Sequence, residues 1–187
     1  MTQQKTRYPI RVAASVARWL MEELGPACER IEVAGSVRRN LQMVGDVELV
    51  CVPRYEEARD LFGQPVQGRD LLDAAIQALI QKGHLEVRTG PSGGRSYGPR
   101  NKFLLHVANG VPVDVFSTEA ANFGLTLFVR TGPRDWNIRA MQRLKQLGLK
   151  GTINEGVWEG TARTMCATEE QVFTLLRWPW TAPEARR

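Results

Sequence analysis

Apolar residues recur at two different spacings along the chain, and the spacings predict both helices and strands. Helical spacing is seen from Tyr8 to Leu24, where Gly25-Pro26 ends the run, and again after Asp70, a predicted N-cap, as far as Gly83. Alternation with a period of two predicts strands at 45–52 and 111–117, and strands are also expected at 31–34, 84–90 and 102–107. These elements predict a sheet with packing helices.

The segments between and after these strands carry turn and helix signals. Asn109-Gly110 predicts a hairpin turn, whereas the polar, Gly- and Pro-containing segment 53–70 predicts a loop with at most a helical turn. From Thr118, a predicted cap, the pattern becomes helical, and a second helix has Pro133 in its first turn. Short strands are expected at 149–160, followed by a helix with a Thr168/Gln171 capping box and a tail at 181–187. The fold class predicted is α+β, divided into residues 1–118 and a smaller α/β unit at 119–187.

The stretch from Ile31 to Val52 combines an anion-binding turn with two acids. A strand enters Gly35-Ser36, after which a short helix would present its first amide groups to an anion. Arg38 and Arg39 follow in the same turn, and an arginine fork suits phosphate oxygens. This arrangement predicts a site for a triphosphate, and the pattern leaves open which of the two arginines holds it.

Three acids lie on strand faces where they could share a metal. Alternation puts Asp46 and Glu48 on one face of their strand, opposite Val47 and Leu49. Asp114 is flanked by apolar residues in a later strand, where burial without a partner would be costly. Carboxylates so placed suit Mg²⁺, which takes a few of them together with substrate phosphates. Taken singly, each of these acids is as well explained as part of a solvated sheet face.

Other polar residues have simpler explanations. Arg95, Tyr97, Arg100 and Lys102 belong to a Gly-rich segment that could touch a nucleic-acid phosphate or base, and a solvated loop is the favoured interpretation. The cysteines are odd in number and lack metal-binding spacing, which predicts reduced thiols and no zinc site.

Gly35-Ser36, Arg39 and Gly45-Asp46-x-Glu48 together resemble the signature of the DNA polymerase beta-like nucleotidyltransferases, the family X DNA polymerases. The resemblance implies a nucleotidyltransferase palm with a mixed β-sheet and packing helices at 1–118, followed by a small α/β thumb at 119–187. It makes Asp46, Glu48 and Asp114 the catalytic metal ligands. Two departures are noted: Glu48 stands where the family normally has Asp, and Pro112 stands where an arginine often precedes the third acid.

The resemblance extends into the second unit. Arg130-Thr131-Gly132 followed by Trp136-Asn137 is similar to the opening of the family thumb, which implies that Thr131, Gly132 and Asn137 bind the nucleotide. Val129 and Arg130 stand where the family often has aromatic residues beside the sugar. The resemblance also implies a minimal form without the lyase domain and helix-hairpin-helix motifs of members active in DNA repair.

The implied activity is addition of deoxynucleotides from a dNTP to the 3′-hydroxyl of a DNA primer, with release of pyrophosphate. Two Mg²⁺ ions would serve as cofactors, with Mn²⁺ as a substitute, and DNA primer-template and nucleoside triphosphate would be the partners. Two alternatives stay open: transfer to another acceptor (RNA, a small molecule or a protein), and a DNA-binding module without activity.

Composition adds little that is specific. The chain has 187 residues, 43% of them hydrophobic, which is enough for a buried core. A net charge of +5 is compatible with a polyanionic partner and does not require one. No leader or long apolar run is present, so we expect a soluble monomer in the cytoplasm without membrane contact.

Overall fold

The computed structural model describes residues 6–89, 96–153 and 155–186. Its helices are α1 (Ile10–Leu24), α2 (Gly35–Arg38), α3 (Leu71–Gln81), α4 (Phe123–Thr131), α5 (Arg134–Gln146) and α6 (Glu169–Leu176), with single 3-10 turns η1 (Gly25–Ala27), η2 (Ala120–Asn122) and η3 (Pro183–Ala185). Its strands are β1 (Tyr8–Pro9), β2 (Cys28–Val33), β3 (Met43–Val44), β4 (Val47–Pro53), β5 (Tyr55–Arg59), β6 (Pro65–Asp70), β7 (Leu85–Val87), β8 (Asn101–His106), β9 (Val111–Ser117), β10 (Lys150–Thr152), β11 (Gly156–Glu159) and β12 (Ala162–Thr164).

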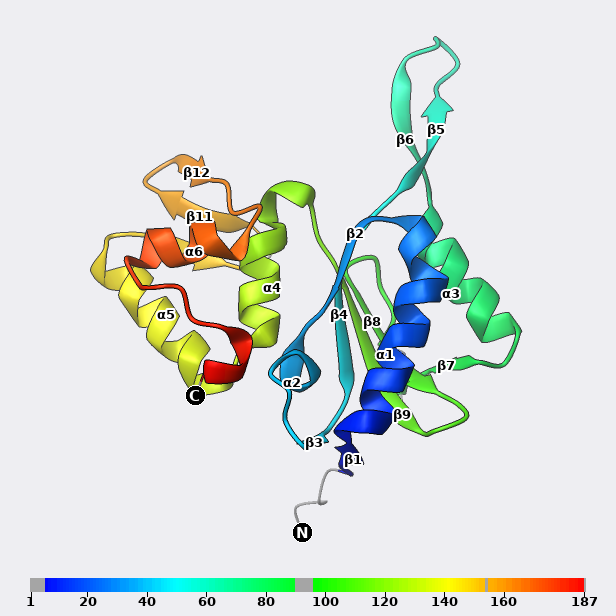
Figure 1. Ribbon diagram of the computed structural model, residues 1–187. Coiled ribbons are helices and arrows are strands. Elements are labelled where there is room, and N and C mark those ends of the chain that lie inside the picture. The colour runs from blue at the N-terminus through cyan, green and yellow to red at the C-terminus, as the bar shows by residue number, and fades with distance from the viewer. Residues whose placement is uncertain (1–5, 90–95, 154, 187) are drawn as a thin grey trace.

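A five-stranded mixed sheet forms the centre of the first half of the chain. Its order is β2-β4-β9-β8-β7, in which β4 and β9 are parallel and the other pairs are antiparallel. Helices α1 and α3 cover one face of this sheet, while α4 approaches the other (Figure 1). The α+β fold class is confirmed by this arrangement.

Burial on the helix-covered face follows the alternation of the sequence. Val111, Val113 and Val115 are fully buried against α1 and α3, and Val47 and Leu49 join them from β4. The opposite face carries Glu48 and Asp114 and, farther along, a small apolar cluster with residues of α4. The sheet therefore has one apolar face and one face that is part core and part acidic surface.

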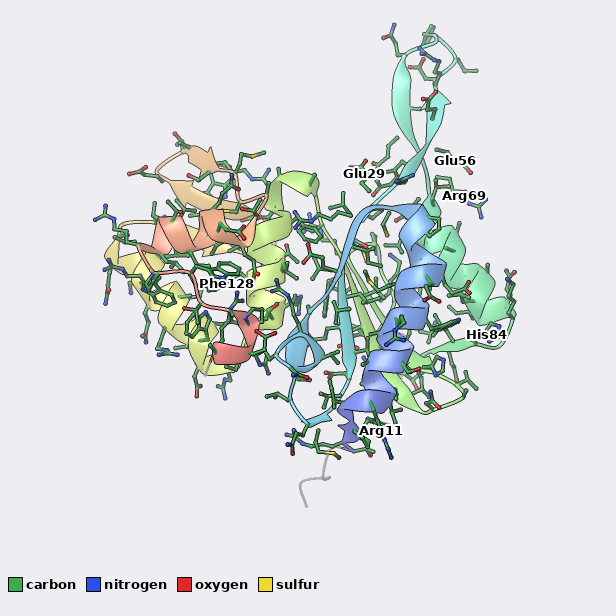
Figure 2. The ribbon with its side chains drawn as sticks, in the orientation of Figure 1. Arg11, Glu29, Glu56, Arg69, His84 and Phe128 are labelled. Atoms are coloured by element: carbon green, nitrogen blue, oxygen red, sulfur yellow. The ribbon has the colours of Figure 1, made fainter. Side chains whose placement is uncertain are left out.

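The C-terminal half has its own core. Helices α4, α5 and α6 pack with the small sheet β10-β11-β12, and Figure 2 shows Phe128 between these helices, where it is fully buried. The capping box of Thr168 and Gln171 is present as predicted. The predicted domain boundary at residue 118 stays a prediction, because the cluster of Val50, Phe116 and Phe123 joins strands and helix across it.

Segment 53–70 is not a loop, and that prediction was wrong. β5 and β6 form a two-stranded arm that projects from the body of the molecule (Figure 1). The Asp60 carboxylate closes its turn by accepting hydrogen bonds from the amides of Phe62 (2.8 Å) and Gln64 (2.9 Å). Because the arm lies outside the core, its strands lack the apolar alternation by which strands are recognised.

Three further expectations need correction. Thr118 does not cap a helix, since its hydroxyl lies 3.0 Å from that of Thr126 and α4 begins only at Phe123. Lys102 is not part of a solvated loop but is fully buried, with its ammonium donating to the Pro99 carbonyl at 3.0 Å. The C-terminal segment is not a loose tail, because Arg186 is buried and paired with Glu169 at 2.7 Å. Arg95 lies outside the described residues.

Candidate active site

Glu48 and Asp114 are neighbours on the open face of the sheet. They are register partners on the parallel strands β4 and β9, and Asp46 directly precedes β4. Adjacent strands lie about 4.8 Å apart, so two such side chains on one face are within electrostatic reach of each other. The structure thus brings Glu48 and Asp114, which are far apart in the chain, onto adjacent strands.

The pKa of Glu48 is affected by its burial and by the neighbouring acids. Burial of the side chain, together with the negative charges of Asp46 and Asp114, raises this pKa from 4.5 to about 7, while Arg130 and Arg39 act in the opposite direction. The charged form of Glu48 is therefore disfavoured first by desolvation and then by the neighbouring acids. Such a set of carboxylate oxygens fits a hard divalent cation, which would reverse the effect on Glu48.

The acid side chains do not converge on one point. In the described parts of the chain, no three His, Cys, Asp or Glu side chains form a group that could hold a metal ion. Asp114 is turned toward Arg88, with which it forms an ion pair, and Glu48 lies against Gly35. The assignment of Asp46, Glu48 and Asp114 as metal ligands stays a prediction.

Gly35 is required by this geometry. Its backbone has φ +64°, and a Cβ at this position would overlap the carboxylate of Glu48. One turn of helix follows, α2, which contains Ser36 and Arg38 and ends before Asn40, a residue with φ 54°. The predicted Gly-Ser turn is present, and it is in direct contact with the second acid of the signature.

The two arginines of this turn have different partners. Arg38 pairs with the buried Glu169 of α6 at 2.7 Å and donates to the hydroxyl of Thr131 at 2.9 Å. Arg39 donates to the carbonyl of Thr131 and lies beside Gly132, where a Cβ would be 3.4 Å from its Nη1. Partial burial lowers the pKa of the Arg39 guanidinium, whereas the negative charge of Glu48 acts to raise it. Both side chains therefore connect α2 to the C-terminal half.

A cavity of about 630 Å³ opens between the turn and helix α5. Its lining includes five of the predicted site residues: Arg39, Glu48, Thr131, Gly132 and Asn137. The Asn137 amide donates to the Val129 carbonyl at 2.7 Å, while its Oδ1 is buried without a hydrogen-bond partner among the described residues. The volume is in the range of small-molecule sites. Asp46 and Asp114 do not line this cavity.

Comparisons with known proteins bear on the fold. No protein-family model matches the chain, and no curated protein matches it in sequence. It superposes on polymerase beta of Leishmania infantum in a ternary P/T complex, with a TM-score of 0.72, 17% identity, and coverage of 97% of this chain and 77% of that one. A ternary gap complex of the same enzyme gives a TM-score of 0.73, 18% identity, and coverage of 97% and 71%. The fold is that of the polymerase beta-like nucleotidyltransferases.

Within this polymerase beta-like fold, Arg88 lies at the acid site although it was not among the site residues predicted from the sequence. Pro112 had indicated that no arginine accompanies the third acid, yet Arg88, which follows β7, pairs with Asp114 from across β8. A signal was present: Leu85 and Val87 pack into the core, so alternation places Arg88 on the opposite face. The order of the strands, which the sequence alone does not provide, was needed to connect Arg88 with Asp114.

Arg130 is a second arginine at the acid site whose position the sequence did not reveal. Its guanidinium carbon lies 3.6 Å from the ring centroid of Phe116, over the face of the ring. Burial lowers the pKa of Arg130, and the charges of Glu48 and Asp114 raise it. The side chain thus lies between the apolar cluster and the acids, and it lines the cavity described above.

None of the helices in the described part of the chain is long and apolar enough to cross a membrane.

Proposed function

We propose that this protein is a metal-dependent nucleotidyltransferase that adds deoxynucleotides from a dNTP to the 3′-hydroxyl of a DNA primer and releases pyrophosphate. One observation carries the proposal: the cavity beside Gly35 is lined by Arg39, Glu48 and Asn137, and it opens next to the acid pair of β4 and β9. The fold neighbours were solved as ternary P/T and gap complexes, which supports the same reaction class.

In this proposal, the turn after β2 holds the triphosphate. The first amides of α2, at Gly35 and Ser36, would donate to phosphate oxygens. Arg39 is the better candidate for the β and γ phosphates, because it lines the cavity, whereas Arg38 is paired with Glu169. An arginine fork binds phosphate through two parallel hydrogen bonds.

The sugar and base would lie along the start of α5. Thr131 and Gly132 form one wall of the cavity, and Asn137 contributes an amide oxygen that has no protein partner in the described chain. Ile138 and Met141 provide apolar surface on the same wall. A base could therefore stack on apolar side chains while its edge meets the Asn137 amide.

Asp46, Glu48 and Asp114 would hold the divalent cations. When bound, these Mg²⁺ ions would lower the pKa of the attacking hydroxyl and offset the negative charge that develops on the phosphate. Glu48 and Asp114 lie on adjacent strands, and in this proposal Asp114 would be the acid nearer the primer end. Burial of Glu48 excludes water from the side that faces Gly35.

A gel assay with a labelled acceptor tests the proposal. The purified protein is incubated with dNTPs and either Mg²⁺ or Mn²⁺, together with a paired DNA primer, a single-stranded DNA or an RNA primer. We expect extension of the paired DNA primer. Extension of RNA alone would indicate transfer to a different acceptor, and the absence of extension with all acceptors, despite DNA binding, would indicate a module without activity.

A further inference from the structure

The arm formed by β5 and β6 has an open strand edge. Among the strands of the described chain, β5 pairs only with β6, and the two strands project from the body (Figure 1). The Asp60 amide donates to the Gln64 carbonyl at 2.9 Å, so the alternation of an antiparallel ladder makes Ala58 the next residue bonded to β6. Glu57 and Arg59 therefore direct their backbone amides and carbonyls away from β6, toward the open edge.

Exposed apolar side chains are concentrated at the tip of this arm. Leu61 is 100% exposed and Phe62 is 88% exposed, the highest values among the large hydrophobic residues of the described chain. The turn that presents them is held by hydrogen bonds, because the Asp60 carboxylate accepts from two amides and Arg59 donates to the Gly63 carbonyl at 2.8 Å. A single two-stranded ribbon is only marginally stable in water, so contacts with a further surface would stabilise the arm.

The charge of the arm favours a protein partner over a nucleic acid. Residues 54–70 contain three arginines and four acids, whereas the whole chain has a net charge of +5. Binding of DNA depends mainly on cations that meet its phosphates, and this segment has no excess of them. A surface on which acids and arginines alternate is instead suited to another protein surface with the complementary order of charges.

The sequence of β5 is complementary to itself. In an antiparallel pair of β5 strands with a two-fold axis at Ala58, Glu57 lies opposite Arg59 of the second copy, and Arg59 lies opposite its Glu57. These are the residues whose backbone groups face the open edge, so each pair can also form two backbone hydrogen bonds. At the axis, the strands approach closely, and the Ala58 methyl group is small enough for that position. β6 is less suited to such pairing, because Pro65 has no amide hydrogen to donate.

The same register gives the apolar tip a binding place. It puts Leu61 opposite Tyr55 of the second copy, which is at the base of the arm. A cavity of about 600 Å³ lies at this base, and its lining includes Tyr55 and Gln67 of the arm and Ile153 of the C-terminal half. The cavity is larger than a Phe side chain, so it can receive Phe62 of the other copy. This contact would remove the most exposed apolar side chains from water.

We propose that two copies of this chain form a symmetric dimer through their arms. The β5 strands pair antiparallel about Ala58, and the Leu61–Phe62 tip of each arm binds in the cavity at the base of the other. The two arms then form one four-stranded sheet in the order β6-β5-β5-β6. The sequence analysis, which took this segment as a loop, expected a monomer. The inference does not depend on the proposed function, because the three acids and the Gly35 turn are not part of this surface.

Sedimentation equilibrium over a wide range of protein concentrations measures the association. One strand pair and two apolar tips form an interface at the small end of the size range of specific interfaces, so we expect a Kd on the order of 10 μM. Phe62→Ala should weaken the dimer about tenfold or more, because two Phe side chains lose their burial. Val107→Ala removes an apolar side chain that is 48% exposed in the turn after β8, and it should leave the Kd unchanged.

Charge exchange tests the register of the two strands. Glu57→Arg and Arg59→Glu each place like charges opposite one another, so each variant alone should dimerise about tenfold more weakly or worse. An equal mixture of the two variants places opposite charges at both positions, and it should dimerise with the affinity of the wild type. The double variant Glu57→Arg/Arg59→Glu should do the same. Circular dichroism of each variant provides the control for folding.

A disulfide cross-link tests the position of the axis. Ala58→Cys, treated with oxidised glutathione, should become linked between copies, because the Cβ atoms of residues directly opposite each other are about 4.5–5.5 Å apart. Gln67→Cys, at an exposed position of β6, is the matched control and should not become linked. The wild type should stay unlinked as well, since Cys28, Cys51 and Cys166 are buried.

Three results would overturn the inference. One is a wild type that stays monomeric at every concentration, and weaker binding of a DNA duplex by Phe62→Ala would then assign the arm to nucleic acid. Another is a dimer whose Kd is the same in Glu57→Arg and in the wild type, which would place the interface on a different surface. The third is equal cross-linking of Ala58→Cys and Gln67→Cys, which would show that the β5 strands are not paired about Ala58.

Discussion

The two flanks of the acid row on β4 and β9 are built differently. At the flank of Gly35, the carboxylate of Glu48 packs against the turn, and Arg38 and Arg39 are bound by Thr131 of the C-terminal half. At the opposite flank, Arg88 pairs with Asp114 across one strand. The first flank is cross-linked by segments far apart in the chain, whereas the second depends on one ion pair, in which the Arg88 side chain is 31% exposed.

This difference indicates that the two flanks have different roles in binding. A cross-linked pocket is arranged before the ligand arrives, so binding a nucleotide there costs little ordering of side chains. A single, partly exposed ion pair constrains the side chains of the second flank less. Substitutions at the first flank should change nucleotide use, and substitutions at the second should change acceptor and metal binding.

Loss of an acid should have the largest effect, because both flanks serve the same carboxylates. We expect Asp46→Asn and Asp114→Asn each to reduce the rate of primer extension about a thousandfold or more, since each removes a full charge with little change of volume. Single-turnover rates on a paired primer provide the measurement. Asp135→Asn, at an exposed position of α5, is the matched control and should keep the wild-type rate. Extension by Asp114→Asn at that rate would reject the site.

Glu48→Gln should separate stability from activity. The pKa of Glu48 is raised from 4.5 to about 7, so the unfolded chain ionises this group at a lower pH than the folded protein does. The free energy of unfolding of the wild type therefore falls as the pH rises through this window, by up to about 3 kcal/mol at pH 8. We expect metal-free Glu48→Gln to gain stability over the wild type between pH 4.5 and pH 8, while losing activity.

Urea denaturation in EDTA at several pH values measures this gain. Glu86→Gln, at an exposed position of β7, should show no pH-dependent difference from the wild type. A stability difference between Glu48→Gln and the wild type that stays constant with pH would contradict the raised pKa of Glu48.

Gly35→Ala compared with Gly83→Ala tests the contact between the turn and Glu48. Both glycines have a positive φ, +64° and +74°, so each substitution should cost about 1 kcal/mol of stability. A Cβ at Gly83 has nothing within 4 Å, whereas one at Gly35 overlaps Glu48. We therefore expect only Gly35→Ala to lose kcat/KM for the nucleotide, about a hundredfold, because the acid is displaced. Equal kinetics for the two variants would show that Glu48 has no fixed position at the turn.

Substitution of the paired arginines should have the smallest effect and should show which one meets the triphosphate. We expect Arg39→Ala to raise the KM for dNTP about tenfold, because a charged hydrogen bond to phosphate is lost. Arg38→Ala should mainly lower the free energy of unfolding, since the buried Glu169 loses one of its two arginines. Steady-state kinetics and urea denaturation of both variants give the comparison, and the reverse pattern would assign the phosphate to Arg38.

Local signals in the sequence were sufficient for several elements. Asp70 caps α3 by accepting a hydrogen bond from the amide of Asp73 at 2.9 Å, as predicted from its position before an apolar run. Asn109-Gly110 forms the turn between β8 and β9, with Gly110 at φ +64°. Such features depend on neighbours within a few residues, which is why the sequence reveals them.

Other features could not be predicted because they depend on distant residues. The burial of Lys102 requires α3, whose Asp73 lies 3.9 Å from the ammonium, and the docking of Arg186 requires the aromatic rings of Phe128 and Phe173. The arm at 55–70 shows no strand pattern because it covers no core. In each case, the residues that are adjacent in the sequence do not indicate the long-range contacts of the segment.

The sequence by itself determined which face of each strand carries an acid and where the Gly-Ser turn lies, because a period of two assigns side chains to faces wherever a strand forms. Only the tertiary structure decided that β4 and β9 are parallel neighbours with Glu48 opposite Asp114, and that Arg88 reaches this pair from beyond β8. The physical reason is that alternation contains no information about which strands are adjacent. That order is set by the packing of α1 and α3 on the sheet and by the pairing of backbone groups between segments distant in the chain.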